Sequence, residues 1–421
     1  MKMKITREKW IFLLIIIQPL IDIATSIASH YGISLTFGSL TRAIMMIGLY
    51  VWLLRYIYLN KPKLMVPFLV SYAAIVLMLL ITFLYKSHLA LFQEINFASK
   101  TGYYLVMLHV SILLFKQKQL AKVTLYNAIF VVSLIVGSSY WLAIATGSSL
   151  NSYHNNKAGF SGWFFSANEL SVILLVLLGL SLVHLWYVKT FRTWLAVALL
   201  MSMVPMIGTK TAFIGGTGLL IVYMLSLILA YRSQIWREKG ALIFLGMGIL
   251  FLCFVPQTPS FSSTEQTQQV QNAEHVSYVD QPAQPVSLLS SRDIYLQETR
   301  ADFTNAPVLR KLFGLGLAGD YKSVPKLIEM DFFDLFFGYG IIGSFLLIMP
   351  LLYLITRVCT GLFPFTVGNT VLTVMLGMCL GIAFLAGHVL FAPSVMTYVS
   401  IGIIALGMEN SRGEKIWRPQ N

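Results

Sequence analysis

Residues 166–188, SANELSVILLVLLGLSLVHLWYV, form an apolar run that opens on a small polar cluster. A helix needs about 20 predominantly apolar residues to cross the hydrocarbon core of a bilayer, and this run has that length. Ser166 and Glu169 stand at the spacing of a capping box, in which their side chains satisfy free amides at a helix start. The run therefore predicts a membrane-spanning helix that begins near residue 166.

Similar runs recur along almost the whole chain of 421 residues, of which 57% are hydrophobic and only 11% charged. Soluble domains have roughly 25% charged residues. Lipid leaves only helices and closed barrels as spanning structures, and the alternating pattern of a barrel is missing. We therefore predict an all-α polytopic membrane protein with twelve transmembrane helices, near residues 10–29, 37–59, 64–85, 100–115, 123–146, 166–188, 192–208, 211–231, 240–256, 332–355, 364–387 and 392–408.

The net charge of +13 is distributed in a way that predicts the orientation of these helices. If twelve helices alternate from a cytoplasmic N-terminus, 19 of the 30 Lys and Arg residues fall on the cytoplasmic side, with at least one in every cytoplasmic loop. This is the positive-inside pattern of plasma-membrane proteins. The charge therefore indicates a cell-membrane protein with both termini in the cytoplasm, and we expect no nucleic-acid partner.

One long connection, residues 257–330, interrupts the apolar runs and divides the chain. We predict nine transmembrane helices in 1–256, an extracytoplasmic loop in 257–330, three helices in 331–408 and a cytoplasmic tail in 409–421. Residues 257–286 have the Gln, Ser, Thr and Pro content of a flexible linker. Residues 287–330 regain apolar residues, and Ser290 with Asp293 predicts a short capped helix over about 291–303. A long structured loop usually has a task, so the outer face is the expected working face.

Basic residues are expected at this outer end, against the positive-inside bias. They lie at the outer ends of predicted helices and in the loop: Arg42, Lys100, Lys210, Arg292 and Arg300. Such a cluster suits an anionic substrate, for example a lipid phosphate or diphosphate. Arg42 could instead form a structural ion pair with Asp22, and the two roles are compatible. Of the two loop arginines we favour Arg292, because Ser290 and Ser291 can orient the helix start beside it.

Carboxylates crowd the end of the loop, in KLIEMDFFDLFF (326–337). The positive end of a helix favours acids in its first turn, which accounts for Asp334. Glu329 and Asp331 remain as candidates to accept a proton from a hydroxyl group, with Glu329 favoured.

Other polar groups could face the same site. Asn168 and Glu169 could line an external pocket, although capping explains Ser166. His388 stands between the last two predicted helices and could carry a proton or cap a helix end. Cys253 and Cys379 lie inside predicted helices and Cys359 just after one, without ligand-like spacing, so we expect packing roles, no disulfide and no metal site.

These features resemble the O-antigen ligase and polysaccharide polymerase superfamily of membrane glycosyltransferases. The resemblance covers the helix arrangement and the large loop before the last three helices. Its local matches are FFSANELSVILLVLL (164–178), MIGTKTAFIGG (206–216), SSRDIY (290–295), LFGLGLAGDY (312–321) and EMDFFDLFFGYGIIG (329–343). The family's usual His-Asn pair corresponds to Glu329 and Met330, and one of its arginines corresponds to Lys210. Glu329 can still accept a proton but does not titrate near neutral pH, and Lys210 keeps the charge without the planar fork.

The resemblance implies transfer of a glycan from an undecaprenyl-diphosphate carrier to an acceptor hydroxyl at the outer face, without metal or nucleotide cofactor. It implies that Arg292, Lys210, Arg42 and Lys100 bind the diphosphate and that Glu329 or Asp331 takes the proton. Members of this variant type are similar to proteins of Gram-positive cell-wall polysaccharide assembly, including teichuronic acid synthesis. The expected partners are the lipid-linked donor, a glycan acceptor, the bilayer and other polysaccharide-assembly proteins.

Two other classes of protein are compatible with many helices and buried charges. A transporter or flippase of lipid-linked oligosaccharide has less need of a structured outer loop and usually shows repeat symmetry, which this sequence lacks. A scaffold within a synthase complex would tolerate loss of the charged residues. A polymerase or ligase would not.

Overall fold

The computed structural model describes residues 2–30, 37–86, 91–115, 122–152, 159–260, 292–317, 327–360 and 366–410. Most of the predicted linker, the capping residues Ser290 and Ser291, and most of the predicted tail lie outside these ranges. The described part is almost entirely helical, as predicted, and its only strands are the short pair β1 (Leu150–Asn151) and β2 (Phe160–Gly162). The chain is an all-α polytopic membrane protein.

Each of the twelve predicted stretches coincides with a helix. They are α1 (Lys2–His30), α2 (Phe37–Asn60), α3 (Met65–Tyr85), α4 (Leu91–Phe115), α5 (Lys122–Ala145), α6 (Ala167–Tyr187), α7 (Phe191–Met206), α8 (Lys210–Tyr231), α9 (Lys239–Phe254), α13 (Asp331–Thr360), α14 (Val367–Leu385) and α15 (Pro393–Asn410). In the described residues, ten helices are long and apolar enough to cross a membrane; α7 is apolar but shorter, and α15 is not among the ten. The fourth helix begins at Leu91, nine residues before the predicted start.

Polar side chains fix several of the helix starts. The hydroxyl of Ser166 accepts a hydrogen bond from the amide of Glu169 at 3.3 Å, which confirms the predicted cap of α6. Thr190, Thr209 and Thr366 cap α7, α8 and α14 in the same way. An uncapped helix start leaves backbone amides without partners, so these hydroxyl groups set where each helix begins.

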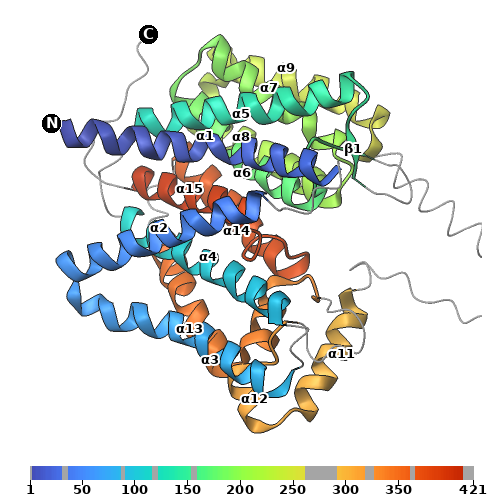
Figure 1. Cartoon of the computed structure of the whole chain (residues 1–421). Coiled ribbons are helices and arrows are strands. Elements are labelled where there is room, and N and C mark those ends of the chain that lie inside the picture. Colours follow the sequence, from blue (N-terminus) through green and yellow to red (C-terminus); the bar gives the residue numbers. More distant parts are fainter. Residues whose placement is uncertain are drawn as a thin grey trace, which may run out of the picture.

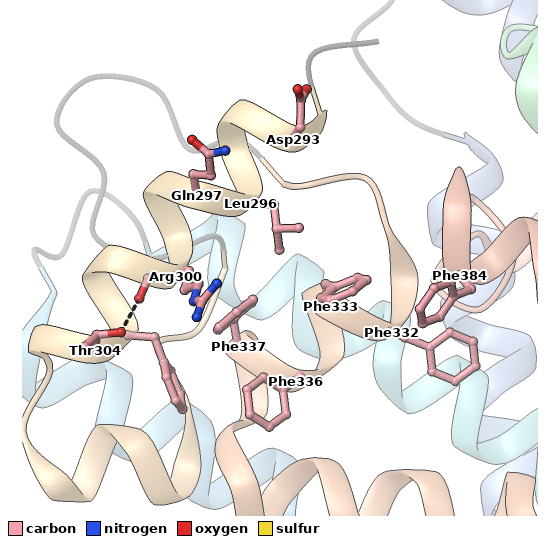
Figure 2. Close-up of a pocket in the computed structure, with 11 residues that line it drawn as sticks. Asp293, Leu296, Gln297, Arg300, Thr304, Phe332, Phe333, Phe336, Phe337 and Phe384 are labelled. Carbon is pink, nitrogen blue, oxygen red and sulfur yellow. Dashed lines mark hydrogen bonds between the residues drawn. The ribbon is translucent and has the colours of Figure 1, made fainter. Parts of the chain in front are cut away.

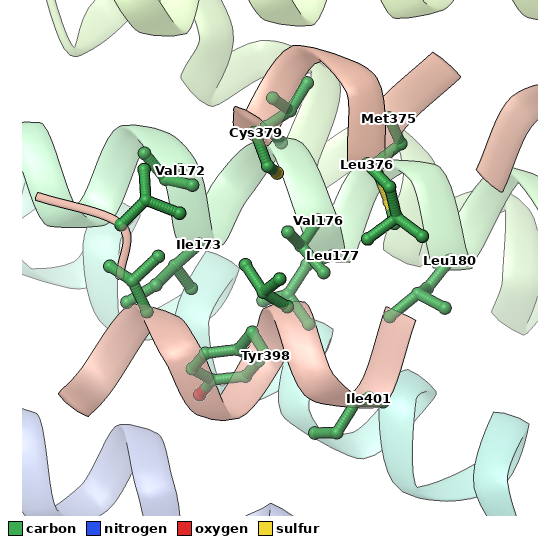
Figure 3. Close-up of a cluster of buried hydrophobic side chains, with 14 of the residues drawn as sticks. Val172, Ile173, Val176, Leu177, Leu180, Met375, Leu376, Cys379, Tyr398 and Ile401 are labelled. Atoms are coloured by element: carbon green, nitrogen blue, oxygen red, sulfur yellow. The ribbon is translucent and has the colours of Figure 1, made fainter. Parts of the chain in front are cut away.

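The centre of the bundle is formed by α6, α14 and α15, and almost every residue of α6 and α15 is buried (Figure 1). Val176 and Leu177 of α6 face Leu376 of α14 and the ring of Tyr398 of α15 (Figure 3). Close packing here depends on small residues, because a Cβ added at Gly179 would lie 2.5 Å from the sulfur of Met375. Such small residues allow helices to approach closely within a membrane. Of the cysteines, only Cys379 packs in this core; Cys253 and Cys359 are exposed, contrary to the prediction.

Helix α13 is broken near its first third. Gly340 has φ +68° inside the helix, so the run Asp331–Tyr339 and the remainder of α13 are separate helical pieces. The carbonyl groups freed by the break are taken up elsewhere: those of Phe337 and Gly338 accept from the amides of Leu315 and Gly316 at 2.8 and 3.0 Å. Non-helical backbone inside a membrane protein is tolerated where protein groups satisfy it in this way. The segment before α13 is thereby fastened to the break.

Two helices of the long connection cover one end of the bundle. They are α11 (Arg292–Asn305), which confirms the predicted loop helix, and α12 (Val308–Phe313) (Figure 1). The connection between α2 and α3, which includes Pro62–Leu64, lies away from α11 and α12 (Figure 1). The predicted division of basic residues between a cytoplasmic and an outer end stays a prediction.

Candidate functional site

A cavity of about 710 Å³ opens at the end of the bundle that carries α11. Its walls come from α1, α2, α4, α6 and the start of α13, and from the connection between α14 and α15. The predicted site residues that line it are Arg42, Lys100, Glu169, Glu329, Asp331 and His388. Residues more than 300 positions apart in the sequence thus meet in one charged cavity.

Glu329 lies between two cationic groups. Its carboxylate accepts a hydrogen bond from the Arg292 guanidinium at 3.3 Å and lies 3.7 Å from Nε2 of His388. The Glu329 side chain remains 40% exposed, so a molecule in the cavity can reach it. Arg292 is the first residue of α11, so the start of that helix is placed at this carboxylate. The structure therefore combines the favoured arginine, the favoured carboxylate and the histidine.

Both Glu329 and His388 have left-handed backbone conformations, with φ of +63° and +61°. Such values are uncommon for residues other than glycine and point to a conformation imposed by the surroundings. The two backbones pack directly, because a Cβ added at Gly387 would lie 2.5 Å from the carbonyl oxygen of Glu329. The loops before α13 and before α15 therefore hold each other in place.

The other two acids of this segment hold those loops by accepting backbone hydrogen bonds. Asp331 accepts from the amides of His388, Val389 and Leu390 at 3.1, 2.9 and 2.7 Å. Asp334 accepts from the amides of Ile328 and Met330 at 2.9 and 3.1 Å. Both carboxylates are buried. Their oxygen atoms are engaged by the protein, which leaves Glu329 as the accessible acid of the three.

The deeper wall of the cavity holds a second group of polar contacts. Asp22 and Arg42 form the predicted ion pair between α1 and α2. Glu169 of α6 accepts a hydrogen bond from the Ser394 hydroxyl at the start of α15. Lys100 of α4 is half-buried and, among the residues that the structure describes, forms no ion pair. Most of the acids in the cavity thus have protein partners, whereas the Lys100 ammonium is available to a ligand.

Several predicted positions differ from what was expected. Lys100 lies in the third turn of α4 and not at its start, because the helix begins at Leu91. Lys210 is exposed at the start of α8 and does not line the cavity, and Asn168 does not line it either. Arg300 lines a separate groove beneath α11. The expected convergence of five basic residues is therefore wrong for Lys210 and Arg300. Lys210 is exposed at the start of α8, and Arg300 lies in the body of α11 over the separate groove.

The structure also shows residues that the sequence reasoning missed. Lys86 and Glu94 form a buried ion pair at 2.6 Å, and Glu94 also accepts from the amide of Leu317 at 2.8 Å. Leu317 lines the cavity, so this pair anchors the loop to α3 and α4. Two oppositely charged residues eight positions apart at a connection between apolar runs were the available signal. Ser394, the partner of Glu169, carried no signal by itself.

The pKa of His388 is raised above its ordinary value. Burial of the imidazole lowers the pKa, but the interaction with the Glu329 carboxylate outweighs that effect, with smaller contributions from the negative charges of Glu169 and Asp331. A nearby negative charge favours the protonated imidazole. The site thus favours a positively charged His388 beside Glu329.

No group of three or more His, Cys, Asp or Glu side chains in the described ranges is placed to hold a metal ion. The fold and this cavity define a polytopic α-helical membrane protein with a charged cavity at one end of its bundle. The chain belongs to the O-antigen ligase-like membrane protein family, whose model matches residues 4–264 and 255–409. No curated protein matches the sequence significantly. Family membership supports membrane glycan ligation or polymerisation with lipid-linked glycan substrates in general.

Proposed function

We propose that the protein is a glycosyltransferase that polymerises or ligates cell-surface polysaccharide from an undecaprenyl-diphosphate-linked donor at the outer face of the plasma membrane. The observation that carries this proposal is the accessible Glu329 carboxylate, placed between Arg292 and His388 in a cavity that also holds Lys100. Cations that can bind a diphosphate and a carboxylate that can bind a hydroxyl group are the two requirements of the reaction.

The cationic residues act on the donor. Lys100, Arg292 and His388 bind the diphosphate and stabilise the negative charge that develops on it as it leaves the sugar. The deeper wall, where sugar hydroxyl groups bind, is lined by Asp22, Arg42 and Glu169. Asp22 neutralises part of the charge of Arg42. Lys210, Arg300 and Asn168 have no direct part in this step, because they lie outside the cavity.

Glu329 acts on the acceptor. The acceptor oxygen bonds to the anomeric carbon as the bond from that carbon to the diphosphate oxygen breaks, and the leaving diphosphate keeps the electron pair. The hydroxyl proton passes to the Glu329 carboxylate. Glycosyl transfer has an oxocarbenium-like transition state, so the hydroxyl becomes acidic as its oxygen bonds, and a weak base is sufficient. Asp331 positions His388 through its backbone contacts and does not take the proton.

The histidine missing at position 329 is supplied from another segment. The family to which the sequence is similar usually has histidine there, whereas this chain has Glu329 with His388 at 3.7 Å. An imidazole therefore lies beside position 329, although it comes from another segment of the chain.

Reconstitution tests the proposal directly. Purified protein in liposomes is given lipid-linked oligosaccharide, and longer products and released undecaprenyl diphosphate are measured. We expect Arg292→Ala and Glu329→Gln each to lower transfer roughly 10²-fold or more with expression retained. Arg237→Ala, at the opposite end, and Glu298→Gln, on the exposed face of α11, are the matched controls. Wild-type transfer by a site variant removes that residue from the mechanism, and lipid movement across the bilayer without chain growth indicates a flippase.

The finer biological assignment is also part of the proposal. The product is a cell-wall polysaccharide of the teichuronic acid type, the protein works beside other polysaccharide-assembly proteins, and both termini are cytoplasmic. The support is the resemblance of the loop and helix motifs and the distribution of basic residues. Deletion of the gene is expected to remove an acidic polysaccharide from the wall, measured by uronic acid content. Unchanged wall polysaccharide contradicts this assignment.

A further inference from the structure

A second hollow, of about 620 Å³, lies beneath α11 and is separate from the charged cavity. We call it the aromatic groove. Its floor is formed by five phenylalanines from α13 and α14: Phe332, Phe333, Phe336, Phe337 and Phe384. Its roof is α11, from which Leu296 and Arg300 point towards the phenylalanine rings (Figure 2). An aromatic floor under a polar helix is an amphipathic surface.

The starts of α11 and α13 lie between the aromatic groove and the charged cavity. On α13, Asp331 and Asp334 line the charged cavity, whereas the phenylalanines between and after them line the groove. On α11, Arg292 reaches Glu329 in the cavity, and the next residue, Asp293, begins the wall of the groove. The charged cavity and the aromatic groove therefore adjoin at the starts of these two helices.

The groove runs along most of α11. Its wall extends from Asp293 to Thr304, twelve residues. The eleven steps between them span about 16 Å of helix at 1.5 Å per residue. Phe303 closes the far part, with its ring centroid 5.4 Å from that of Phe336 and 5.3 Å from that of Phe337. Phe333 packs 5.4 Å from Phe384 at the floor. The shape suits a long, narrow apolar chain.

The charged residues of α11 indicate what kind of apolar molecule the groove can hold. α11 has five charged residues in fourteen and cannot lie in hydrocarbon without a large cost, so the groove lies at the boundary of the apolar layer. Among the described residues, Arg300 forms no ion pair, and it stands at the groove above the rings (Figure 2). An apolar chain attached to an anionic group complements both features. The part of the apolar chain that leaves the hydrocarbon when the anionic group reaches Glu329 would be shielded from water by the groove.

We propose that the aromatic groove seats the isoprenoid units next to the diphosphate of the lipid-linked donor, with α11 as their cover. This inference rests on the proposed function, which places the diphosphate in the charged cavity. The groove would thereby orient the donor, since a chain held between α11 and the phenylalanines fixes the direction from which the sugar meets Glu329.

Photolabelling tests the occupant. The probe is undecaprenyl diphosphate with a diazirine on an isoprene unit near the diphosphate, and the protein is the full chain in lipid nanodiscs. We expect label in the α11 peptide and at the starts of α13 and the end of α14. Excess unlabelled undecaprenyl diphosphate is expected to reduce the label about tenfold or more, whereas phosphatidylglycerol is not. Label confined to other helices, or label that phosphatidylglycerol removes equally well, overturns the proposal and in the second case assigns the groove to bilayer lipid.

Substitutions provide an independent measurement. Leu296→Trp fills the groove, and Ile294→Trp adds the same bulk on the exposed face of the same helix. We expect Leu296→Trp to raise KM for an undecaprenyl-linked donor about tenfold without changing KM for a donor with a methyl group as its short carrier in place of isoprenoid, and Ile294→Trp to change neither. If Leu296→Trp fails to fold, Phe384→Ala is the second test variant and Leu385→Ala is its control. Both residues are exposed, and of the two only Phe384 lines the groove. Equal effects on long and short carriers overturn the proposal.

The two experiments separate this inference from the proposed function. Groove labelling without any glycan transfer contradicts the proposed function and supports the isoprenoid seat. Glycan transfer with label outside the groove supports the proposed function and contradicts the isoprenoid seat.

Discussion

At the scale of single residues, Glu329 and His388 have strained backbones and are also the proposed functional groups of the cavity. Left-handed conformations of non-glycine residues cost about 1–3 kcal/mol each and persist only when the surroundings impose them. Here Asp331 and Asp334 impose them, through five hydrogen bonds from backbone amides. The acids that resemble a catalytic cluster in the sequence thus divide into one accessible group and two groups that hold it in place.

The raised pKa of His388 predicts a pH dependence of stability. A group whose folded pKa exceeds its unfolded value, about 6.5 for histidine, stabilises the fold fully below the unfolded pKa and loses that contribution as pH rises through the folded pKa. Glu329→Gln removes the main negative partner. We therefore expect wild type to exceed Glu329→Gln in stability most at acidic pH, by less than about 1 kcal/mol because Glu329 is 40% exposed, and the difference to vanish at alkaline pH.

Thermal unfolding in detergent from about pH 5.5 to about pH 8.5 measures this difference. Glu298→Gln on the exposed face of α11 is the control, and its small effect should not vary with pH. A difference that grows towards alkaline pH contradicts the predicted ion pair.

Residue-level prediction from sequence succeeded where a charge stood out against an apolar background. Asp22 with Arg42 is an example, because buried charges are rare and need partners. The preference for Arg292 over Arg300 as a functional residue stays a prediction. It could not show that Glu169 bonds to Ser394, since a serine is unremarkable in a helix and the pair is separated by 225 positions. Pairing across such distances is fixed by packing, which a single sequence does not display.

At the scale of elements, the break in α13 is the feature that positions the site. The apolar pattern predicted a single span, and the glycines of GYGIIG were read only as a family motif. In the structure, Gly340 interrupts the helix and Gly314 fits against it, because a Cβ at Gly314 would lie 2.0 Å from the Gly338 carbonyl oxygen. Apolar periodicity shows how long a helix can be but not where a distant segment replaces its hydrogen bonds.

Gly314→Ala is therefore expected to be strongly destabilising. The substitution combines the clash with a φ of +103°, so we expect a loss of about 3 kcal/mol or more of folding free energy. Gly381→Ala is the control, because its Cβ meets no atom within 4 Å in α14 and helical Gly to Ala changes gain about 0.5–1 kcal/mol. Unfolding of both variants in the same detergent measures the contrast. Equal stability of the two variants would show that the break does not need Gly314.

At the scale of the whole molecule, the sequence predicts different tasks for the two ends of the bundle. One end is predicted to carry the basic connections, and the other carries α11, α12 and the charged cavity. The helical class and this division followed from apolar length and from the positive-inside pattern, which are properties of composition and order. The shape of the cavity did not, because it depends on how twelve helices pack.

Cysteine labelling tests the orientation. In a background in which Cys253, Cys359 and Cys379 are replaced, we expect Glu298→Cys to react with a membrane-impermeant maleimide in intact cells. Lys61→Cys and Arg237→Cys, at the basic end, should react only after the membrane is permeabilised, because positive connections stay in the cytoplasm. Reaction of Lys61→Cys in intact cells reverses the topology and moves the charged cavity to the inner face.

The cavity takes walls from α1, near the start of the chain, and from Ser394 of α15, near its end. Synthesis proceeds from the N-terminus, and early segments fold before later ones exist. Glu169 therefore enters the membrane without the hydroxyl group that it later contacts, and Glu329 and Asp331 are made before the segment of His388 that they contact. The site closes only when the last helix has been inserted, so a nascent or truncated chain contains most of the membrane helices but no working centre.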